Sequence, residues 1–209
     1  MGDSCPLCHS NSSKFHKNEQ QYHQCVSCMA IFMDAEYHLD QQQEKTRYLE
    51  HNNDVEDEGY QQFVSPITSS VLQNHTSDQQ GLDFGAGTGP VIAKVLADNG
   101  FKLDLYDPFF HHNPAVLTRQ YDYIVCCEVM EHFYNPDKEF ALLKRLLKPN
   151  GRLYCMTDLY YEEIDFPNWY YQKDNTHVFF YHRNTLSHIK QHYGFSDLTI
   201  DGRLVVLIA

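Results

Sequence analysis

Four cysteines near the N-terminus have the type and spacing of metal ligands. They form two Cys-x-x-Cys pairs separated by 16 residues: Cys5 and Cys8, then Cys25 and Cys28. Two such pairs supply four thiolates for a tetrahedral Zn²⁺ site, and the metal provides the core that so short a segment lacks. His9, His16 and His23 compete as ligands, but four thiolates already fill the coordination shell. A closed site of this kind leaves no position for substrate, so we expect a structural zinc ribbon over residues 1–33.

A glycine-rich segment over residues 82–90 is the second feature with chemical potential, because glycine occupies every second position from Gly85. Such a turn brings backbone N–H groups close to a ligand, and a side chain at Gly85 or Gly87 would occupy the ligand's space. Pro90 stands where the dinucleotide fingerprint requires Gly or Ala, and the Gly-Lys-Ser/Thr of a P-loop is absent. Asp107 follows 22 positions after Gly85, where a carboxylate accepts hydrogen bonds from the hydroxyls of an adenosine ribose.

Alternating strands and helices must position these residues. Short apolar runs predict strands over 82–84, 102–106, 121–127 and 152–157, and amphipathic patterns predict helices over 91–98, 137–147 and 185–192. An antiparallel pair, 195–201 with 203–208, is predicted to follow. The fold class is therefore α/β, a Rossmann-like, mostly parallel sheet with a terminal antiparallel strand and a small N-terminal zinc ribbon.

The length of 209 residues fits one domain with a small appendage. We expect the zinc ribbon over residues 1–33, a solvated linker with one short helix over the polar residues 34–59, and the main domain over residues 60–209. Apolar residues at helical spacing predict one helix over 60–74 that leads into the main domain. Pro66 falls in its early turns or kinks it.

Four ordered motifs carry a resemblance to a known family. They are Asp83-x-Gly85-x-Gly87-x-Gly89, Asp107, the strand from Tyr121 that leads to Glu128-Val129-Met130-Glu131-His132, and Leu147-Lys148-Pro149-Asn150-Gly151-Arg152-Leu153. In this order the chain resembles the class I S-adenosylmethionine-dependent methyltransferases, in the branch of the ubiquinone-pathway O-methyltransferases with their Glu-Val-x-Glu-His segment. The resemblance covers residues 81–157 well and the remainder loosely. It implies methyl transfer with S-adenosyl-L-methionine as cofactor.

The resemblance also implies a set of cofactor-binding residues: Asp83, Gly85, Ala86, Gly87, Gly89, Asp107, Pro108 and Glu128. The glycine turn would pass against the methionine part of the cofactor, Asp107 would bind the ribose, and Glu128 would lie beside the sulfonium. Asp83 would hold the turn or bind the amino group. Two alternatives remain open, since Asp83 can cap the loop and Asp107 can serve as a turn residue before Pro108.

The chain departs from the family pattern between the second and third strands. Only 13 residues, 108–120, connect them, which is too few for a full helix and a full strand. We therefore expect a truncated sheet edge without the acidic residue that many relatives place on the adenine amino group. Phe109 and Phe110 either flank the adenine or belong to the core.

Methyl transfer from a sulfonium depends mainly on positioning, and a base is needed only when the acceptor loses a proton. His177, in an aromatic segment after the predicted strand 152–157, is our preferred base because imidazole titrates near neutrality. His132 and Glu131 are the next candidates, although either can instead anchor the loop. Asp158 and Tyr160 also follow a strand end.

Several aromatic residues between 160 and 181 form either a lid over the site or a second small core. Tyr48, His51 and Tyr60 are candidates to cover the cofactor from the other side. The three remaining cysteines are expected to be small core residues in strands: Cys126, Cys127 and Cys155.

The formal net charge of −12 disfavours nucleic acid and anionic membranes as partners. Residues 1–33 contain only Lys14 and Lys17 as cationic side chains, which also argues against RNA. We see neither a signal peptide nor a membrane span and expect a cytoplasmic chain. The leading hypothesis is a methyltransferase acting on a small polar, aromatic or sugar-like metabolite. An RNA or protein methyltransferase that uses the ribbon for substrate binding, and a non-catalytic binder of the cofactor, remain alternatives.

Overall fold

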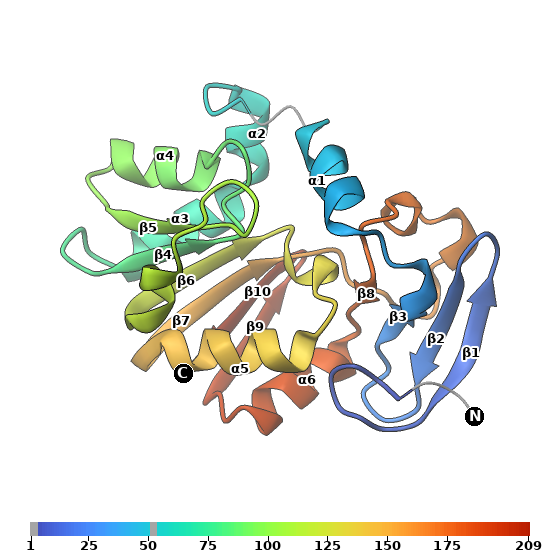
Figure 1. Ribbon diagram of the computed structural model, residues 1–209. Helices are drawn as coiled ribbons and strands as arrows, with labels where there is room; N and C mark the ends of the chain where they lie inside the picture. Colours follow the sequence, from blue (N-terminus) through green and yellow to red (C-terminus); the bar gives the residue numbers. More distant parts are fainter. Residues whose placement is uncertain (1–3, 51–53) are drawn as a thin grey trace.

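A six-stranded sheet forms the centre of the larger part of the molecule (Figure 1). The computed structural model describes residues 4–50 and 54–209. The strands of this sheet are β4 (Gly81–Phe84), β5 (Leu103–Tyr106), β6 (Tyr121–Cys127), β7 (Leu147–Met156), β9 (Asp197–Asp201) and β10 (Leu204–Ile208). Their order is β5-β4-β6-β7-β10-β9, with β4 to β7 parallel to one another and β10 antiparallel to both of its neighbours. The predicted α/β class and mostly parallel sheet are confirmed.

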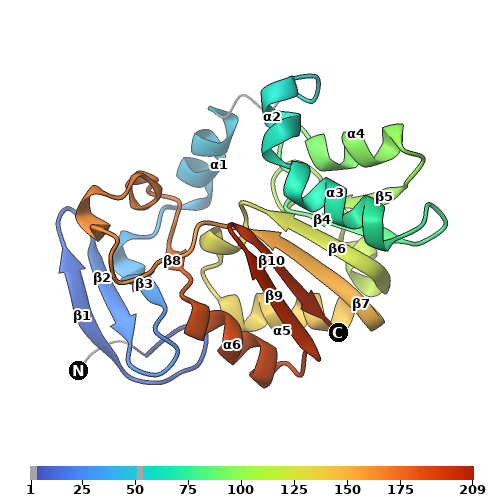
Figure 2. The same cartoon turned by 180° about the vertical axis from the view of Figure 1, so that it is seen from behind.

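Helices cover both faces of this sheet. One face is covered by α2 (Glu58–Phe63), α3 (Ser65–Asn74) and α4 (Val91–Asp98), and the other by α5 (Pro136–Leu146) and α6 (Arg183–His192) (Figures 1 and 2). Side chains alternate between the two faces along β6, as the pleat of a strand requires. Tyr123 and Val125 join the core under α3 and α4, whereas Ile124 and Cys126 join the core under α5 and α6.

The segment before β4 differs from the single helix predicted over 60–74. Val64 ends α2 and begins α3. Pro66 lies in the first turn of α3, where a proline is tolerated because the N–H it lacks would have no intrahelical partner. In a continuous helix the same ring would clash with the carbonyl group four residues earlier, so the helix divides in two.

The predicted truncation of the sheet edge is confirmed. β5 is the edge strand, and residues 108–120 contain one short 3-10 helix, η2 (Pro114–Thr118). Within the described residues, no strand pairs with the outer side of β5.

The N-terminal residues form a second sheet that takes one strand from a distant part of the chain. β1 (Ser12–Lys17), β2 (Gln21–Cys25) and β3 (Ile31–Met33) pair antiparallel, and β8 (Phe179–Phe180) completes the sheet beside β3. In both ribbon views the orange segment after β7 lies against the blue N-terminal strands (Figures 1 and 2). The division at residue 33 stays a prediction, but the strands on its two sides share one sheet.

An aromatic core fills the space between this small sheet and the segment after β7. Tyr22 packs edge-on against Phe166 with ring centroids 5.1 Å apart, and Phe166 packs in the same way against Phe180 at 5.3 Å. Phe166 belongs to the 3-10 helix η4 (Phe166–Asn168), and η5 (Tyr170–Lys173) follows it. Most of the aromatic side chains that suggested either a lid or a second core are therefore core residues.

Residues 34–50 are more ordered than the solvated linker that we expected. A 3-10 helix, η1 (Ala35–Tyr37), precedes α1 (Gln41–Leu49), which begins with a capping box formed by Asp40 and Gln43. The Glu44 carboxylate is buried and accepts a hydrogen bond from the Tyr48 hydroxyl at 2.7 Å. These two side chains lie one helical turn apart on the side of α1 that faces the protein. The polar composition of the segment gave no sign of this buried side.

The part of the chain that the structure describes contains no helix that is long and apolar enough to cross a membrane.

Candidate functional site

The carboxyl ends of the four parallel strands meet at one edge of the larger sheet, which is the usual ligand-binding edge of α/β proteins. The glycine turn follows β4, Asp107 follows β5, Glu128 follows β6 and Thr157 follows β7. The topology thus brings together residues that are widely separated in the sequence.

The glycine turn after β4 is fixed by backbone geometry. Gly85 has φ +84°, and a Cβ atom on it would lie 2.4 Å from Val129 Cγ2. We expected a side chain at Gly85 to occupy the space of a ligand, but in the structure Val129 occupies that space. The Gly85 and Ala86 N–H groups both donate to the Tyr106 carbonyl, at 2.8 and 3.1 Å, so the turn is attached to the end of β5. Gly87, with φ +60°, continues it.

The Asp107 carboxylate accepts three backbone hydrogen bonds. Its Oδ2 accepts from Gly87 N at 3.0 Å, and its Oδ1 accepts from Phe109 N at 2.8 Å and Phe110 N at 3.0 Å. Asp107 therefore joins the glycine turn to the turn at Pro108, as the turn-residue alternative requires. Its role toward a ribose stays a prediction.

Asp83 is buried one strand away from Asp107. Burial, together with the nearby Asp107 carboxylate, raises the pKa of Asp83 to about 7. Gly89 is also buried, and its carbonyl accepts a hydrogen bond from Val91 N at the start of α4. These contacts hold the entry to the helix, and the cofactor roles of both residues stay predictions.

Glu128 occupies an unusual backbone position at the end of β6. Its φ of +52° lies in the left-handed region that non-glycine residues rarely adopt, and such positions concentrate at functional sites. Oε2 accepts from Arg203 Nη2 at 2.6 Å and from the Tyr171 hydroxyl at 3.3 Å. Burial and the neighbouring Glu131 carboxylate raise the pKa of Glu128 to about 8.

The three residues proposed for catalysis come together. Glu131 and His132 lie in the 3-10 helix η3 (Met130–His132), and His177 precedes β8. One ligand atom from each of the three lies within 4.8 Å of the others, and the two imidazole rings are 4.8 Å apart, centroid to centroid. The sequence-predicted cluster therefore exists as a geometric unit, whereas its catalytic role is not tested by this geometry.

The backbone fixes the tautomers of both histidines. His132 Nδ1 lies 2.9 Å from the Thr176 carbonyl oxygen, and His177 Nδ1 lies 2.6 Å from the Tyr171 carbonyl oxygen. A carbonyl oxygen only accepts, so each Nδ1 carries the proton, and a ring in its neutral form then has its lone pair on Nε2. Burial lowers the pKa of His132, which keeps that ring neutral. The contact with Thr176 is also the loop anchor that the alternative interpretation of His132 requires.

Glu131 is fully buried behind the two histidines. Its carboxylate accepts hydrogen bonds from the Tyr171 hydroxyl and, at 3.2 Å, from the Thr157 hydroxyl. Burial raises the pKa of Glu131 to about 7, and these hydrogen bonds limit the increase. Glu131 can therefore exchange a proton near neutral pH.

Asp158 and Tyr160, the two remaining candidates for the base, lie outside the cluster of Glu131, His132 and His177. Asp158 accepts a hydrogen bond from the Tyr170 hydroxyl at 2.7 Å. Tyr160 belongs to the aromatic core, where its ring packs edge-on against Phe15 at 5.8 Å.

Aromatic residues from α1 and α2 approach this site from the opposite side. Tyr48 packs edge-on against His132 at 5.4 Å and lies 5.7 Å from the Phe109 ring. Tyr60 is half-buried near Asp83 and Glu128, and desolvation is the main reason that its pKa is raised. His51 lies outside the described residues. The places of Tyr48 and Tyr60 suit the covering role proposed for them.

A cavity of about 460 Å³ opens beside the cluster. It is lined by residues from α1, α2, the end of β6, the segment after β7 and the β9–β10 turn: Arg47, Phe63, Glu128, Tyr170, Tyr171, Lys173, Asp174, His177 and Arg203. Its volume falls in the range of small-molecule sites, about 300–1,000 Å³.

Sequence reasoning missed the cationic side of this cavity. Arg47 lies in the segment interpreted as a linker and pairs with Asp174 at 2.7 Å, and Arg203 lies in the turn before β10. One signal for Arg203 was present, since a terminal strand antiparallel to β7 must begin near the carboxyl end of β7. The register confirms this geometry by pairing Leu204 with Met156.

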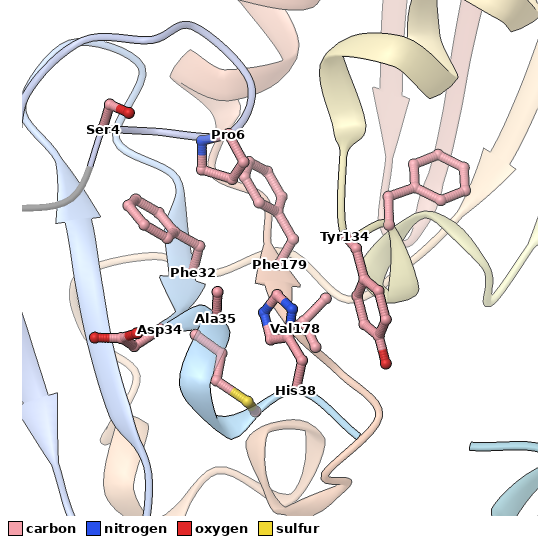
Figure 3. A pocket seen from close by; sticks show the side chains of 11 residues that line it. Ser4, Pro6, Phe32, Asp34, Ala35, His38, Tyr134, Val178 and Phe179 are labelled. Carbon is pink, nitrogen blue, oxygen red and sulfur yellow. The ribbon is translucent and has the colours of Figure 1, made fainter. Parts of the chain in front are cut away.

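A smaller pocket of about 130 Å³ lies between β3, η1 and β8 (Figure 3). Its walls are mainly apolar, and His38 stacks on Tyr134 at its edge with ring centroids 4.5 Å apart. This volume is below that of ordinary ligand sites, and the proposed catalytic residues do not line it. The larger cavity is the candidate functional site.

The four N-terminal cysteines also converge. Cys5 Sγ lies 3.7 Å from Cys28 Sγ, Cys8 Sγ lies 3.3 Å from Cys25 Sγ, and all four sulfur atoms are within 4.8 Å of one another. A tetrahedral ion with Zn–S bonds of about 2.3 Å requires sulfur atoms roughly 3.8 Å apart, so the four thiols fit a zinc ion. Zinc itself stays a prediction.

The other three cysteines lie in the central sheet. Cys126 and Cys155 are fully buried and Cys127 is half-buried, in agreement with small residues in strands.

Comparison with known families and proteins gives a consistent result. A family described as "Methyltransferase domain" matches residues 56–200, which is more than half of the chain. The ubiquinone biosynthesis O-methyltransferase of Klebsiella pneumoniae is 30% identical over 91 residues, which cover 44% of this chain and 38% of that protein. The enzyme of the same name from Photobacterium profundum is also 30% identical over 91 residues, covering 44% of this chain and 39% of the relative. The matched stretch thus spans less than two fifths of each relative.

Among solved structures, an O-methyltransferase family protein from Burkholderia thailandensis shares the fold. Its TM-score is 0.53 at 13% sequence identity, over 79% of this chain and 61% of that chain.

Proposed function

This chain belongs to the methyltransferase-domain family, and from that premise we propose that it transfers the methyl group of S-adenosyl-L-methionine to a small polar, aromatic or sugar-like molecule. The resemblance to class I S-adenosylmethionine-dependent methyltransferases is confirmed at the level of the family. The observation that carries the proposal is the convergence of Glu131, His132 and His177 beside a cavity of about 460 Å³, at the strand edge that also holds the glycine turn.

The cofactor is proposed to bind along the glycine turn, with its ribose at Asp107. The positive φ angles of Gly85 and Gly87 keep the backbone close to the strand ends, and the Asp107 carboxylate keeps the turns after β4 and β5 together. A carboxylate oxygen has more than one acceptor site, so Asp107 can accept from ribose hydroxyls while it keeps the backbone contacts. Phe109 and Tyr48 supply aromatic surface on the same side.

The reaction proposed is an in-line displacement at the methyl carbon. A lone pair of the acceptor oxygen forms the new bond to carbon, and the electron pair of the breaking carbon–sulfur bond passes to sulfur, which leaves as S-adenosylhomocysteine. The acceptor proton passes to Nε2 of His177, which carries the lone pair because Nδ1 donates to the Tyr171 carbonyl. His132 and Glu131 form the wall behind His177, and positioning supplies much of the acceleration.

The same three residues also have the composition of a divalent-cation site. Two imidazoles and one carboxylate suit several divalent metal ions, and the close approach of their ligand atoms permits a shared ion. An ion there would lower the pKa of a hydroxyl group bound to it. Removal of metal with EDTA and addition of Mg²⁺ or Mn²⁺ decides between the two chemistries, with the zinc content measured in parallel. Turnover that is lost and returns supports the ion, and turnover that persists supports His177 alone.

We propose a structural Zn²⁺ ion at the four N-terminal cysteines. The spacing of the sulfur atoms fits the ion, and the chemistry that it supplies is the cross-linking of two chain turns. The Cys28 carbonyl accepts a hydrogen bond from the Thr185 hydroxyl at 2.8 Å, which links the cysteine cluster to α6.

Calorimetric titration with S-adenosylhomocysteine and a labelled-methyl assay over small phenols, catechols and sugars test this function. We expect His177→Asn to reduce kcat at least tenfold with little effect on S-adenosylhomocysteine affinity. His192→Asn, on the exposed side of α6, is the matched control and should keep full activity. The proposal fails if S-adenosylhomocysteine does not bind, and the role of His177 fails if the asparagine variant retains the parent rate.

A further inference from the structure

The cavity wall has an unusual charge for this protein. Three cationic side chains line it, Arg47, Lys173 and Arg203, together with the carboxyl groups of Glu128 and Asp174. The whole chain has a formal net charge of −12, so this concentration of cations runs against its average.

Arg203 is held in place by two aromatic rings and one carboxylate. Its guanidinium lies over the Phe63 ring at 5.1 Å and the Tyr171 ring at 5.8 Å, while Nη2 donates to Glu128. Stacking on two rings fixes the plane of the guanidinium before any ligand arrives, which lowers the entropic cost of binding.

Two buried polar atoms of this pair lack a partner. Among the described residues, neither Arg203 Nε nor Glu128 Oε1 takes part in a hydrogen bond. Leaving a buried donor of a charged group unpaired costs free energy. The Arg203 guanidinium also has further N–H donors besides the one that Glu128 accepts. A guanidinium can donate to both oxygens of a carboxylate, because the geometry of its donors matches the two oxygens.

We propose that this cavity binds the acidic group of the methyl acceptor, which is therefore a small organic acid, and that Arg203 fixes its position. This inference rests on the proposed function and deepens it. His177 lies on the wall of the same cavity, so one small molecule can place its carboxylate at Arg203 and its reacting oxygen at His177.

The cofactor's methionine carboxylate is the other possible occupant. The glycine turn and Asp107 do not line this cavity, whereas Tyr170, Tyr171 and Lys173 of the segment after β7 do. The cavity meets the cofactor's expected path only at Glu128, beside the predicted place of the sulfonium, and the acceptor must reach the methyl group there. We therefore assign the carboxylate at Arg203 to the acceptor, and the competition experiment below tests the cofactor as its source.

Fluorescence of the single tryptophan provides a binding assay that does not depend on turnover. Trp169 is buried, and its ring lies 5.3 Å from that of Tyr171, a cavity residue. We would titrate the full chain, with and without saturating S-adenosylhomocysteine, with benzoate, benzamide and benzyl alcohol. We expect benzoate to bind at least tenfold more tightly than the two neutral compounds, and to bind in both states.

Arg203→Gln should weaken benzoate binding at least tenfold, with a smaller loss for Arg203→Lys, which keeps the charge but loses the planar fork. Arg183→Gln, at the exposed start of α6, is the matched control. Circular dichroism tests whether each variant is folded. If Arg203→Gln does not fold, the benzoate affinity of Arg203→Lys provides the test instead.

Three results would overturn the inference. Equal affinity for benzoate and benzamide would show that the cavity does not recognise the acidic group. Unchanged benzoate affinity in the Arg203 variants would show that Arg203 does not bind the carboxylate. Competition of benzoate with S-adenosylhomocysteine, but not with 5′-methylthioadenosine, would assign the site to the cofactor's own carboxylate. Failure of S-adenosylhomocysteine to bind at all would instead refute the proposed function, while benzoate titration of the free protein still tests the acid site.

Discussion

Gly85→Ala is the substitution whose cost can best be worked out from the structure. The new Cβ would lie 2.4 Å from Val129 Cγ2 and 2.7 Å from Val129 Cγ1, whereas ordinary contacts begin at 3.4 Å. The residue must also keep φ +84°. The left-handed backbone costs an alanine about 1–2 kcal/mol, and overpacking beside Val129 adds about 1–3 kcal/mol. We expect the free energy of unfolding to fall by the sum of these two effects.

Two companion variants separate the effects. Gly194 has φ +68°, and apart from its two chain neighbours no atom of the described residues lies within 4 Å of the place that a Cβ on it would take. Gly194→Ala should therefore show the backbone cost alone. Val129→Ala removes both methyl groups that collide with the new Cβ, so it should restore part of the loss when combined with Gly85→Ala. The double-mutant cycle gives the size of this restoration.

Urea unfolding followed by circular dichroism measures the parent protein and all four variants, and calorimetry with S-adenosylhomocysteine reports on the turn itself. Equal losses for Gly85→Ala and Gly194→Ala would show that Val129 does not restrict this position. A double variant no more stable than Gly85→Ala alone would refute the steric argument altogether.

Three further predictions concern the cofactor, the metal and the acidic cluster. Asp107→Ala should weaken S-adenosylhomocysteine binding by about 1–3 kcal/mol. Asp104→Asn, in the strand that precedes Asp107 and paired with Arg119, should not. Unchanged affinity of the alanine variant by calorimetry would count against the ribose site. Cys5→Ser should release zinc and loosen the N-terminal segment, while Cys127→Ser should not; full zinc occupancy of Cys5→Ser by metal analysis would refute the four-thiolate site. Because burial raises the pKa of Glu131 to about 7 from an ordinary value of 4.5, the folded state binds this proton more tightly than the unfolded state, so the resulting stability is complete below about pH 4.5 and is lost as the pH rises through about 7. Urea unfolding across this range should show a smaller decline for Glu131→Gln, and identical pH profiles would show that Glu131 does not titrate as proposed.

The central sheet could be predicted because each of its strands has a local signal. After Asp122 the run to Cys127 is apolar on both faces, as a strand between two helical layers must be, and the predicted bounds, 121–127, agree with β6. The short connection over residues 108–120 predicted the truncated edge of the sheet in the same way. Asp107 and the cluster at Glu131 were found because they follow such strands directly.

The remaining features depend on contacts between distant segments, which leave a weak trace in the sequence. β8 has only two residues and is a strand because it pairs with β3. The helix that carries Arg47 and Tyr48 is polar on most of its surface, so its composition indicated solvent exposure. Arg203 acquires its place from Phe63 and Tyr171, which lie far away along the chain.

The pairing of β8 with the N-terminal strand β3 limits how this protein can be shortened or divided. Phe179 and Phe180 lie two and three positions after His177, and their backbone partners are Phe32 and Ile31. Met33 N also donates to the Val178 carbonyl at 2.8 Å. A shortened chain that begins after residue 33 would leave the β8 edge and its aromatic neighbours unpaired, which favours aggregation. Because β3 and β8 are far apart along the chain, the smaller sheet can be completed only after the segment that carries β8 has been synthesised.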